Sequence, residues 1–355
     1  MSEKTNPGNH FEDFRIGMTI VHATPRTVTD GDVSLYTALY GSRFPVQSSS
    51  AFAQAVGLPG APLDDMLLFH MVFGKTVPDI SLNAVANLGY ASGRFHAPVY
   101  PGDTISTVSE VIGLTENSNG KTGTVYVRSI GSNQRNDTVL EYIRWVMVRK
   151  KDSRSPAPGA VVPELPKAVA VAELSVPDGL NLSGYDTDLA GSIFLWEDYA
   201  VGERIDHVDA MTVEESDHMT ATRLYQNTAK VHFNQHTEKD GRFGRRIVYG
   251  GHIISLARAF SFNGLANAFK IIAINGGRHI APIFAGDTVY AWSEVLSKDE
   301  LPDRRDLGAL RLRLVATRDK SCATFPYKND EGKYDPAVVL DFDYTVLMPR
   351  KRLGA

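Results

Sequence analysis

The residues of this chain best suited to chemistry stand in a polar stretch, residues 226–234, and at the start of the predicted helix that follows it. His232 has a side chain whose ordinary pKa is about 6.5, so it can accept or donate a proton near neutral pH. Asn227 has an amide that can bind a water molecule but cannot act as a base. At Gly250 and Gly251, free N–H groups and the helix dipole favour negative charge. These four residues predict proton transfer beside a developing anion.

A duplication within the chain shows which elements must position them. Residues 11–17 (FEDFRIG) are matched by residues 196–202 (WEDYAVG), at an offset of 196 − 11 = 185. At an offset of 277 − 93 = 184, residues 93–98 (GRFHAP) are matched by residues 277–282 (GRHIAP). An offset that holds over most of each half indicates two copies of one domain.

Each copy is predicted to run through a loop, a helix, a second loop, a central helix and then four or five antiparallel strands. Strands are predicted where the sequence alternates or is rich in β-branched residues, at 125–128, 287–292 and 310–314. Helices are predicted over residues 213–224 and from residue 250 onward. This is an α+β architecture in which a sheet wraps around a helix, and two such sheets can pair edge to edge.

The two copies are separated by a proline-rich segment, residues 151–190. Proline removes a backbone donor, so a long helix is excluded there. We therefore predict an N-terminal domain over residues 1–150, a linker over 151–190 and a C-terminal domain over 191–355. Residues 326–337 occur only in the second copy and are predicted to form a surface loop.

The composition argues against several classes of function. The formal net charge of −4 and the pI of about 6.2 argue against a nucleic-acid partner. The N-terminus does not resemble a secretory signal and no apolar run approaches the roughly 18 residues of a membrane span, so we expect a soluble, cytoplasmic protein without a membrane partner. The one cysteine, Cys322, cannot form an internal disulfide, which agrees with a reducing compartment. No zinc, nucleotide or serine-hydrolase motif is present, and no metal site is predicted.

Each copy resembles a MaoC-like dehydratase domain with the hot-dog fold, and the whole chain resembles a tandem (double) hot-dog acyl-CoA hydratase. The family motif D-x-N-P-x-H, which precedes the central helix, corresponds to residues 227–232; here His232 is kept and Asn227 replaces the aspartate. In the first copy the corresponding residues 42–47 keep only the proline. This asymmetry implies that the C-terminal copy is catalytic and that the N-terminal copy shapes an acyl pocket.

Among double hot-dog proteins with this departure, the chain is most similar to the mesaconyl-CoA hydratases, also called β-methylmalyl-CoA dehydratases. The resemblance implies reversible hydration of mesaconyl-CoA, a short branched enoyl-CoA, by a hydro-lyase that needs no cofactor beyond the CoA of its acyl-CoA substrate. His232 would be the general acid/base, and Asn227 would bind the attacking water. The N–H groups of Gly250 and Gly251 would stabilise the thioester enolate. A homodimer is expected, as is common for symmetric enzymes.

The second carboxylate of mesaconyl-CoA requires a cation or a cluster of donors. Arg278 and Arg94, at matching positions of the two copies, are candidates, as is Arg43 within the eroded motif. Asp65 falls where Gly250 does in the other copy. Helix capping is its default role there, and it is a reserve acid because some hot-dog dehydratases pair a histidine with a carboxylate on this helix.

Two other functions fit the same fold. An acyl-CoA thioesterase would hydrolyse the thioester and release a free thiol. A non-catalytic acyl-CoA binding protein would bind the ester without turnover, and the missing aspartate at position 227 keeps that alternative open. The retained spacing of His232 argues against it.

Overall fold

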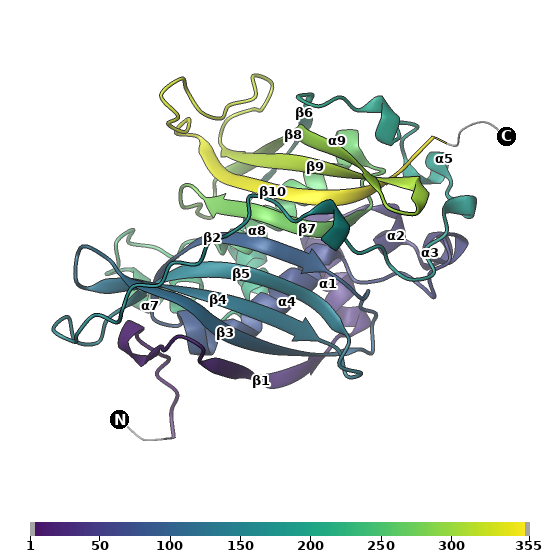
Figure 1. The fold of residues 1–355 in the computed structure, drawn as a ribbon. Coiled ribbons are helices and arrows are strands. Elements are labelled where there is room, and N and C mark those ends of the chain that lie inside the picture. The colour runs from purple at the N-terminus through teal and green to yellow at the C-terminus, as the bar shows by residue number, and fades with distance from the viewer. Residues whose placement is uncertain (1–3, 352–355) are drawn as a thin grey trace.

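A ten-stranded antiparallel sheet runs through the whole molecule in the computed structural model, which describes residues 4–351 (Figure 1). The strand order is β1-β3-β4-β5-β2-β7-β10-β9-β8-β6, so each half of the chain contributes five neighbouring strands. β2 and β7 join the halves, with Tyr90 opposite Gly277 and Arg94 opposite Ala273. The predicted edge-to-edge pairing is therefore confirmed, and β1 and β6 form the two edges of the sheet.

The N-terminal half contains the first five strands and the central helix α4. Its elements are β1 (Thr19–Thr27), α1 (Asp30–Tyr40), α2 (Pro45–Ser48), α3 (Ser50–Ala55), α4 (Asp65–Thr76), a π-helical turn (Val77–Ser81), β2 (Ala84–Phe95), β3 (Thr104–Glu116), β4 (Thr122–Ser132) and β5 (Thr138–Arg149).

The C-terminal half repeats this order around the central helix α8. Its elements are β6 (Arg204–Thr212), α6 (Glu215–Leu224), a short 3-10 helix (Lys230–His232), α7 (Gln235–Glu238), α8 (Gly250–Phe260), α9 (Phe262–Leu265), β7 (Lys270–His279), β8 (Thr288–Leu301), β9 (Arg304–Arg318) and β10 (Val338–Pro349).

The element boundaries confirm the duplication read from the sequence. β1 and β6 begin 204 − 19 = 185 residues apart, as do α4 and α8, at 250 − 65 = 185. The first strand of each half was predicted as loop, and that prediction is wrong. β1 lies at the edge of the sheet and buries only His22, so it lacks the apolar alternation that identifies a strand.

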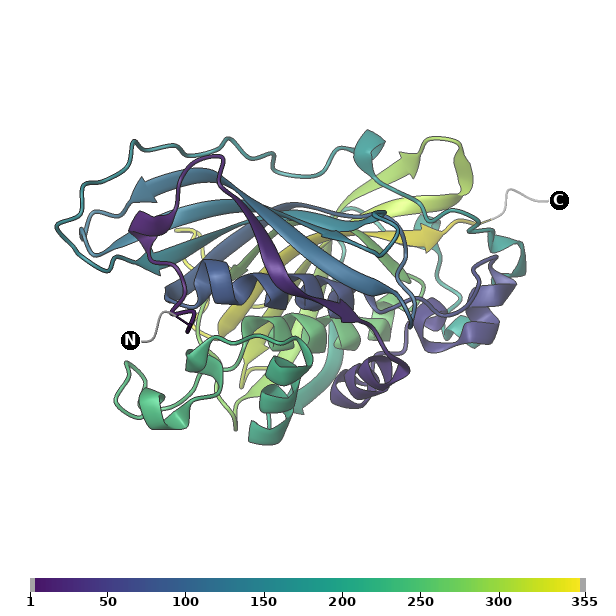
Figure 2. The same ribbon diagram turned by 90° about the horizontal axis from the view of Figure 1, so that it is seen from below.

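The two central helices pack side by side on one face of the sheet (Figure 2). Every residue of α4 is buried, and every residue of α8 after Gly250. The sequence predicted one buried face for α8. The structure buries it all round because it contacts strands of its own half and also α1, α4 and α6.

Residues 151–190 cross the surface without a long helix, as the prolines predicted. They contain only short turns, at Val171–Glu173, Leu182–Gly184 and Thr187–Ala190 (α5). Residues 326–337 form a loop closed by a bridge between Lys328 and Tyr334. Within residues 4–351, no helix combines the length and the apolar character that crossing a membrane requires.

Candidate active site

The polar stretch 226–234 is held where the end of α6 meets α4 of the other half. A Cβ atom at Gly74 of α4 would lie 1.7 Å from the carbonyl oxygen of Tyr225, so only glycine permits this approach. The chain then turns at Gln226, where φ is 52°, and the Asn227 N–H donates to the Thr222 carbonyl over 3.0 Å. Contact with the N-terminal half therefore determines where this stretch begins.

His232 ends the short helix Lys230–His232, and its ring is held from one side. Its Nδ1 lies 3.0 Å from the carbonyl oxygen of Ile247. Because a carbonyl only accepts, Nδ1 carries the proton and the Nε2 lone pair is left to act as a base. Burial lowers the pKa of His232 to about 4, so the ring is neutral at pH 7. The ring packs 5.5 Å from that of Tyr249, the residue that precedes α8.

The first turn of α8 has no capping side chain, and two histidine rings pack closely against its glycines. A Cβ atom at Gly250 would lie 2.3 Å from Cε1 of His279, and one at Gly251 would lie 2.5 Å from Cε1 of His70. No side chain caps this helix, and within residues 4–351 no acceptor contacts the N–H groups of Gly250 or Gly251. These N–H groups and the helix dipole can stabilise an anionic oxygen.

His279 and His70 were not predicted from the sequence as part of the site. Nε2 of His279 lies 3.3 Å from the Tyr90 hydroxyl, and burial lowers the pKa of His279 to about 4. His70 is fully buried, which lowers its pKa to about 3, and its Nδ1 lies 3.3 Å from the Tyr249 hydroxyl. In the sequence, the signal that could have pointed to His279 is that it aligns with Phe95 of the other copy, so that only the second copy has a histidine there. Nowhere in residues 4–351 do three His, Cys, Asp or Glu side chains gather as metal ligands.

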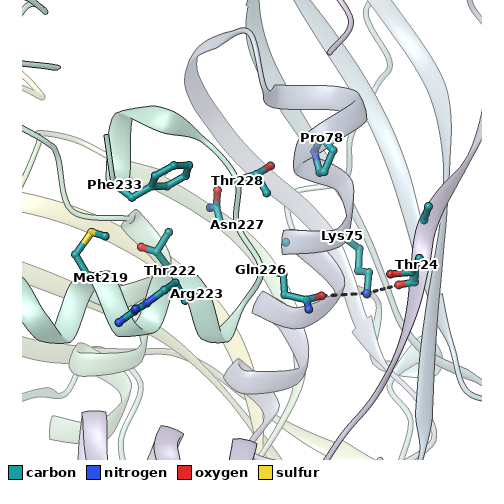
Figure 3. A pocket seen from close by; sticks show the side chains of 12 residues that line it. Thr24, Lys75, Pro78, Met219, Thr222, Arg223, Gln226, Asn227, Thr228 and Phe233 are labelled. Carbon is teal, nitrogen blue, oxygen red and sulfur yellow. Dashed lines mark hydrogen bonds between the residues drawn. The ribbon is translucent and has the colours of Figure 1, made fainter. Parts of the chain in front are cut away.

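Asn227 is buried and shapes the loop that leads to His232. Its Oδ1 accepts the N–H of Ala229 over 3.0 Å, an Asx-type turn. Its side chain also lines a cavity (Figure 3). The amide oxygen is thus engaged within the loop, and the amide NH2 group is the part of Asn227 that can meet a ligand.

A cavity of about 540 Å³ lies between the two halves beside this loop. It contacts Asn227 and Phe233, which flank the turn that carries His232. From the N-terminal half, Lys75 reaches its wall and donates to the carbonyl of Thr24 and to Oε1 of Gln226, 3.2 Å away (Figure 3). Burial lowers the pKa of Lys75.

The structure brings none of the three predicted arginines to His232. Arg278 is exposed on the outer face of the sheet, because neighbouring residues of a strand point to opposite faces and His279 points inward. Arg94 pairs with Glu141 (2.6 Å) and Glu173 (2.8 Å). Arg43 is exposed, 4.7 Å from the ring centre of Phe262, which follows the C-terminal end of α8.

Asp65 lies away from His232 as well, and both of its oxygens are occupied. It pairs with Lys270, and its Oδ2 accepts the N–H of Ile271 over 2.8 Å. Burial raises the pKa of Asp65 despite this lysine. Lys270 and His279 are the two ends of β7, about 30 Å apart at roughly 3.3 Å per residue, so Asp65 cannot exchange a proton with His232. The helix cap is supplied instead by Asp64, which accepts the N–H of Met66 over 2.9 Å.

Comparison with known proteins identifies the family. The sequence model described as mesaconyl-CoA hydratase matches residues 1–326. The chain belongs to the mesaconyl-CoA hydratase family. It is 68% identical to the β-methylmalyl-CoA dehydratase of Chloroflexus aurantiacus, over 99% of this chain and 100% of that one. It is 59% identical to the mesaconyl-CoA hydratase of Cereibacter sphaeroides, over 98% of this chain and 100% of that one.

Solved structures agree with this membership in the mesaconyl-CoA hydratase family. A MaoC domain protein dehydratase from Chloroflexus aurantiacus superposes with a TM-score of 0.97 at 68% identity, over 99% of this chain and 100% of that one. A Mycobacterium tuberculosis protein described as a double hot-dog fold superposes with a TM-score of 0.76 at 25% identity, over 97% and 99%. The predicted double hot-dog fold is confirmed.

Proposed function

We propose that this chain is a hydro-lyase that catalyses the reversible hydration of mesaconyl-CoA to β-methylmalyl-CoA, with His232 as the general acid/base. Relatives named for the two directions of this reaction match the chain over almost its whole length, at 68% and 59% identity. The observation that carries the mechanism is a neutral imidazole packed against Tyr249, directly before the open first turn of α8. In this proposal residues 191–355 supply the chemistry and residues 1–150 supply the acyl pocket.

In the hydration direction the thioester oxygen would lie at the N–H groups of Gly250 and Gly251. Nε2 of His232 takes a proton from water, and the oxygen of that water bonds to the β-carbon as the double bond shifts toward the thioester. The resulting enolate oxygen is stabilised by the N–H groups and the positive end of the helix dipole. The α-carbon then receives a proton from protonated His232, so one proton is taken and one is returned. Dehydration is the same path reversed.

The low pKa of His232 keeps the ring unprotonated, as removal of a proton from water requires, but it also makes the ring a weak base. At neutral pH almost every molecule has the unprotonated base, since the pKa is about 4. A base of low pKa is intrinsically weak, so the proton transfer needs the enolate to be stabilised at the same time. The NH2 group of Asn227 would orient the water, because its Oδ1 is already bonded to Ala229.

These steps use only side chains, backbone groups and water, so we propose that no cofactor is needed besides the CoA of the substrate. We also propose a cytoplasmic homodimer. The pairing of β2 with β7 already joins two hot-dog halves within one chain, so a dimer would not be required to complete the site. Light scattering coupled to gel filtration measures the oligomeric state.

The test is a pair of measurements on one reaction mixture. Purified protein is mixed with mesaconyl-CoA, the enoyl absorbance is followed, and free thiol is titrated at intervals. Hydration removes the enoyl absorbance without releasing thiol and approaches the same equilibrium from β-methylmalyl-CoA. Thiol release in step with the substrate lost would identify a thioesterase instead, and tight binding without either change would identify a binding protein.

A further inference from the structure

An arginine is buried in the N-terminal half beneath the end of α4. Arg144 lies on β5, and its side chain has no exposed surface. Its Nη2 donates to the hydroxyls of Thr76 (2.8 Å) and Ser81 (3.3 Å). The guanidinium lies 4.3 Å from the ring centre of Phe73. The charged group is therefore inside the core, on the same side of the sheet as the central helices.

Arg144 has no counter-ion among the residues that the structure describes. Its Nε and Nη1 contact no acceptor there, and the groups that influence its pKa are tyrosines and not carboxylates. Asp79, the acidic residue of the neighbouring turn, pairs instead with His22, 2.7 Å from its Nδ1. Burial lowers the pKa of Arg144, as expected for a cation removed from water. An unpaired buried cation is strongly unfavourable unless a ligand completes it.

A second polar group beside Arg144 also lacks a partner. Tyr142 is the next residue of β5 that points toward the helices, and it is buried. Its hydroxyl makes no hydrogen bond of ordinary geometry within residues 4–351, and the side chains of Ser129 and Thr76 are the polar groups nearby. Two neighbouring side chains thus present unused donors in an otherwise apolar core, which is the arrangement expected of a site for an anion.

Two series of side-chain contacts connect Arg144 to the start of α8. In the sheet, Arg144 is directly opposite Tyr90, whose hydroxyl lies 3.3 Å from Nε2 of His279. The His279 ring in turn covers Gly250. Through the helices, the Phe73 ring that Arg144 contacts lies 5.8 Å from the ring of Tyr249. These contacts connect Arg144 to the start of α8, from the half that would hold the acyl group.

The equivalent place in the C-terminal half contains an arginine, Arg258, whose two terminal nitrogens are both hydrogen-bonded. Tyr344 of β10 corresponds to Arg144, at 344 − 144 = 200, the offset that pairs residues 139–142 with 339–342. Arg258 of α8 corresponds to Phe73, so arginine and ring have exchanged positions. Arg258 donates to Oγ of Ser261 (3.1 Å) and to the carbonyl of Ala268. Among the residues that the structure describes, two buried guanidinium nitrogens of Arg144 lack a hydrogen-bond partner, whereas no buried nitrogen of Arg258 does.

We propose that Arg144 binds the free carboxylate of the substrate and so selects dicarboxylic acyl groups. The inference rests on the proposed function, in which that carboxylate is bonded to the carbon that receives the hydroxyl group. Its oxygens would accept from the free N–H groups of the guanidinium and from the Tyr142 hydroxyl. A charged, hydrogen-bonded pair in a dry pocket discriminates strongly against an acyl group that lacks the carboxylate.

The test compares the binding of two unreactive CoA esters by calorimetry. Methylsuccinyl-CoA keeps the carboxylate, and 2-methylbutyryl-CoA has a methyl group in its place. Wild type is expected to bind methylsuccinyl-CoA at least about tenfold more tightly. In Arg144→Gln this ratio is expected to fall to one or below, while the affinity for 2-methylbutyryl-CoA stays within about threefold. On mesaconyl-CoA, kcat/KM is expected to fall about 100-fold or more.

Arg144→Met is the companion variant, because it removes the unpaired charge with an apolar side chain of similar length. Its melting temperature is expected to equal or exceed that of wild type, together with the same loss of preference. Arg128→Gln is the control, since Arg128 is exposed on β4 and pairs with Glu110 at 2.8 Å. It is expected to change neither affinity nor kcat/KM.

A folded Arg144 variant that keeps the preference, or that loses affinity for both esters equally, overturns the proposal. The esters report on Arg144 even without turnover. A wild type that does not hydrate mesaconyl-CoA would contradict the proposed function, whereas a wild type that does so without preferring methylsuccinyl-CoA would contradict only the role of Arg144.

Discussion

Gln47 and His232 occupy the same position in the two halves, 232 − 47 = 185 residues apart, and each is held by a backbone carbonyl. Nε2 of Gln47 donates to Phe269 over 2.8 Å, and Nδ1 of His232 donates to Ile247 over 3.0 Å. The histidine keeps a second nitrogen with a lone pair, and the amide has no group that exchanges protons near neutral pH. In the proposed mechanism the same fold position therefore serves as a structural anchor in one half and as a base in the other.

The starts of the central helices α4 and α8 also differ between the two halves. Asp65 begins α4 and closes that position by pairing with Lys270 of the other half, whereas Gly250 leaves the start of α8 open. The linker residues Leu180 and Leu182 belong to one buried apolar cluster with Phe269 and with residues of the N-terminal half such as Val46. At the start of α4, an ion pair and a cluster of apolar residues thus fill the region that corresponds to the open start of α8.

The sharpest test of this comparison is the pair His232→Ala and Gln47→Ala. His232→Ala is expected to lower kcat on mesaconyl-CoA about 10³-fold or more, because the general acid/base is removed. Gln47→Ala is expected to change kcat less than about threefold, since it removes only a structural hydrogen bond. Initial rates measure both, and circular dichroism checks the fold. Equal losses in the two variants would contradict the division of labour.

The ion pair at the closed helix start is expected to affect stability rather than chemistry. Asp65→Asn leaves Lys270 buried without a counter-ion, so the free energy of unfolding is expected to fall by about 3–5 kcal/mol. At a temperature where the variant remains folded, its kcat should match that of wild type. Urea unfolding and initial rates provide the two measurements. A fall in kcat as large as that of His232→Ala would instead place Asp65 in the chemistry.

Gly250→Ala is the matched change at the open helix start. Its Cβ would lie 2.3 Å from the His279 ring, so the first turn or the ring must move. We expect kcat to fall about 10²-fold, the usual effect of removing one well-placed oxyanion donor. Little change in kcat would show that the thioester oxygen does not lie at this turn.

His22 and His207 are equivalent residues of the two halves. Their contributions to stability at acid pH are expected to differ, and this effect is smaller than those above. Nδ1 of His207 contacts the carbonyl of Asn263, and burial lowers the pKa of His207 to about 4. Nδ1 of His22 contacts the carboxylate of Asp79. This carboxylate partly offsets the lowering of the His22 pKa by burial. A folded pKa below the ordinary value of about 6.5 means that the unfolded state binds the proton first. The stabilisation by His207 is complete above pH 6.5 and is lost as the pH falls toward 4.

His207→Gln is therefore expected to reduce the slope of unfolding free energy against pH by about 1.4 kcal/mol per unit between pH 6.5 and 4. His22→Gln is expected to reduce it less, because the carboxylate already favours the charged ring. Urea titrations at several pH values measure the slopes. Identical slopes in the two variants would remove the distinction between these histidines.

Much of this arrangement follows from local patterns in the sequence. The repeat offset, the strands at 125–128 and 310–314, and the start of α8 are all determined by neighbours along the chain. His232 could be singled out because a motif and a repeat partner both fall within a few residues of it. β1 and β6 escaped prediction because an edge strand that buries few side chains has no apolar alternation.

The duplication, the fold class and the half that retains a histidine could all be read from the sequence, because periodicity and spacing are local properties. Which cation is buried without a counter-ion depends instead on the tertiary structure. Around Arg144, apolar residues occupy both alternations of β5, so the face to which each side chain points depends on where the helices pack. The absence of a counter-ion within residues 4–351 likewise depends on side chains brought together from α4, β2 and β5, which no spacing along the chain records.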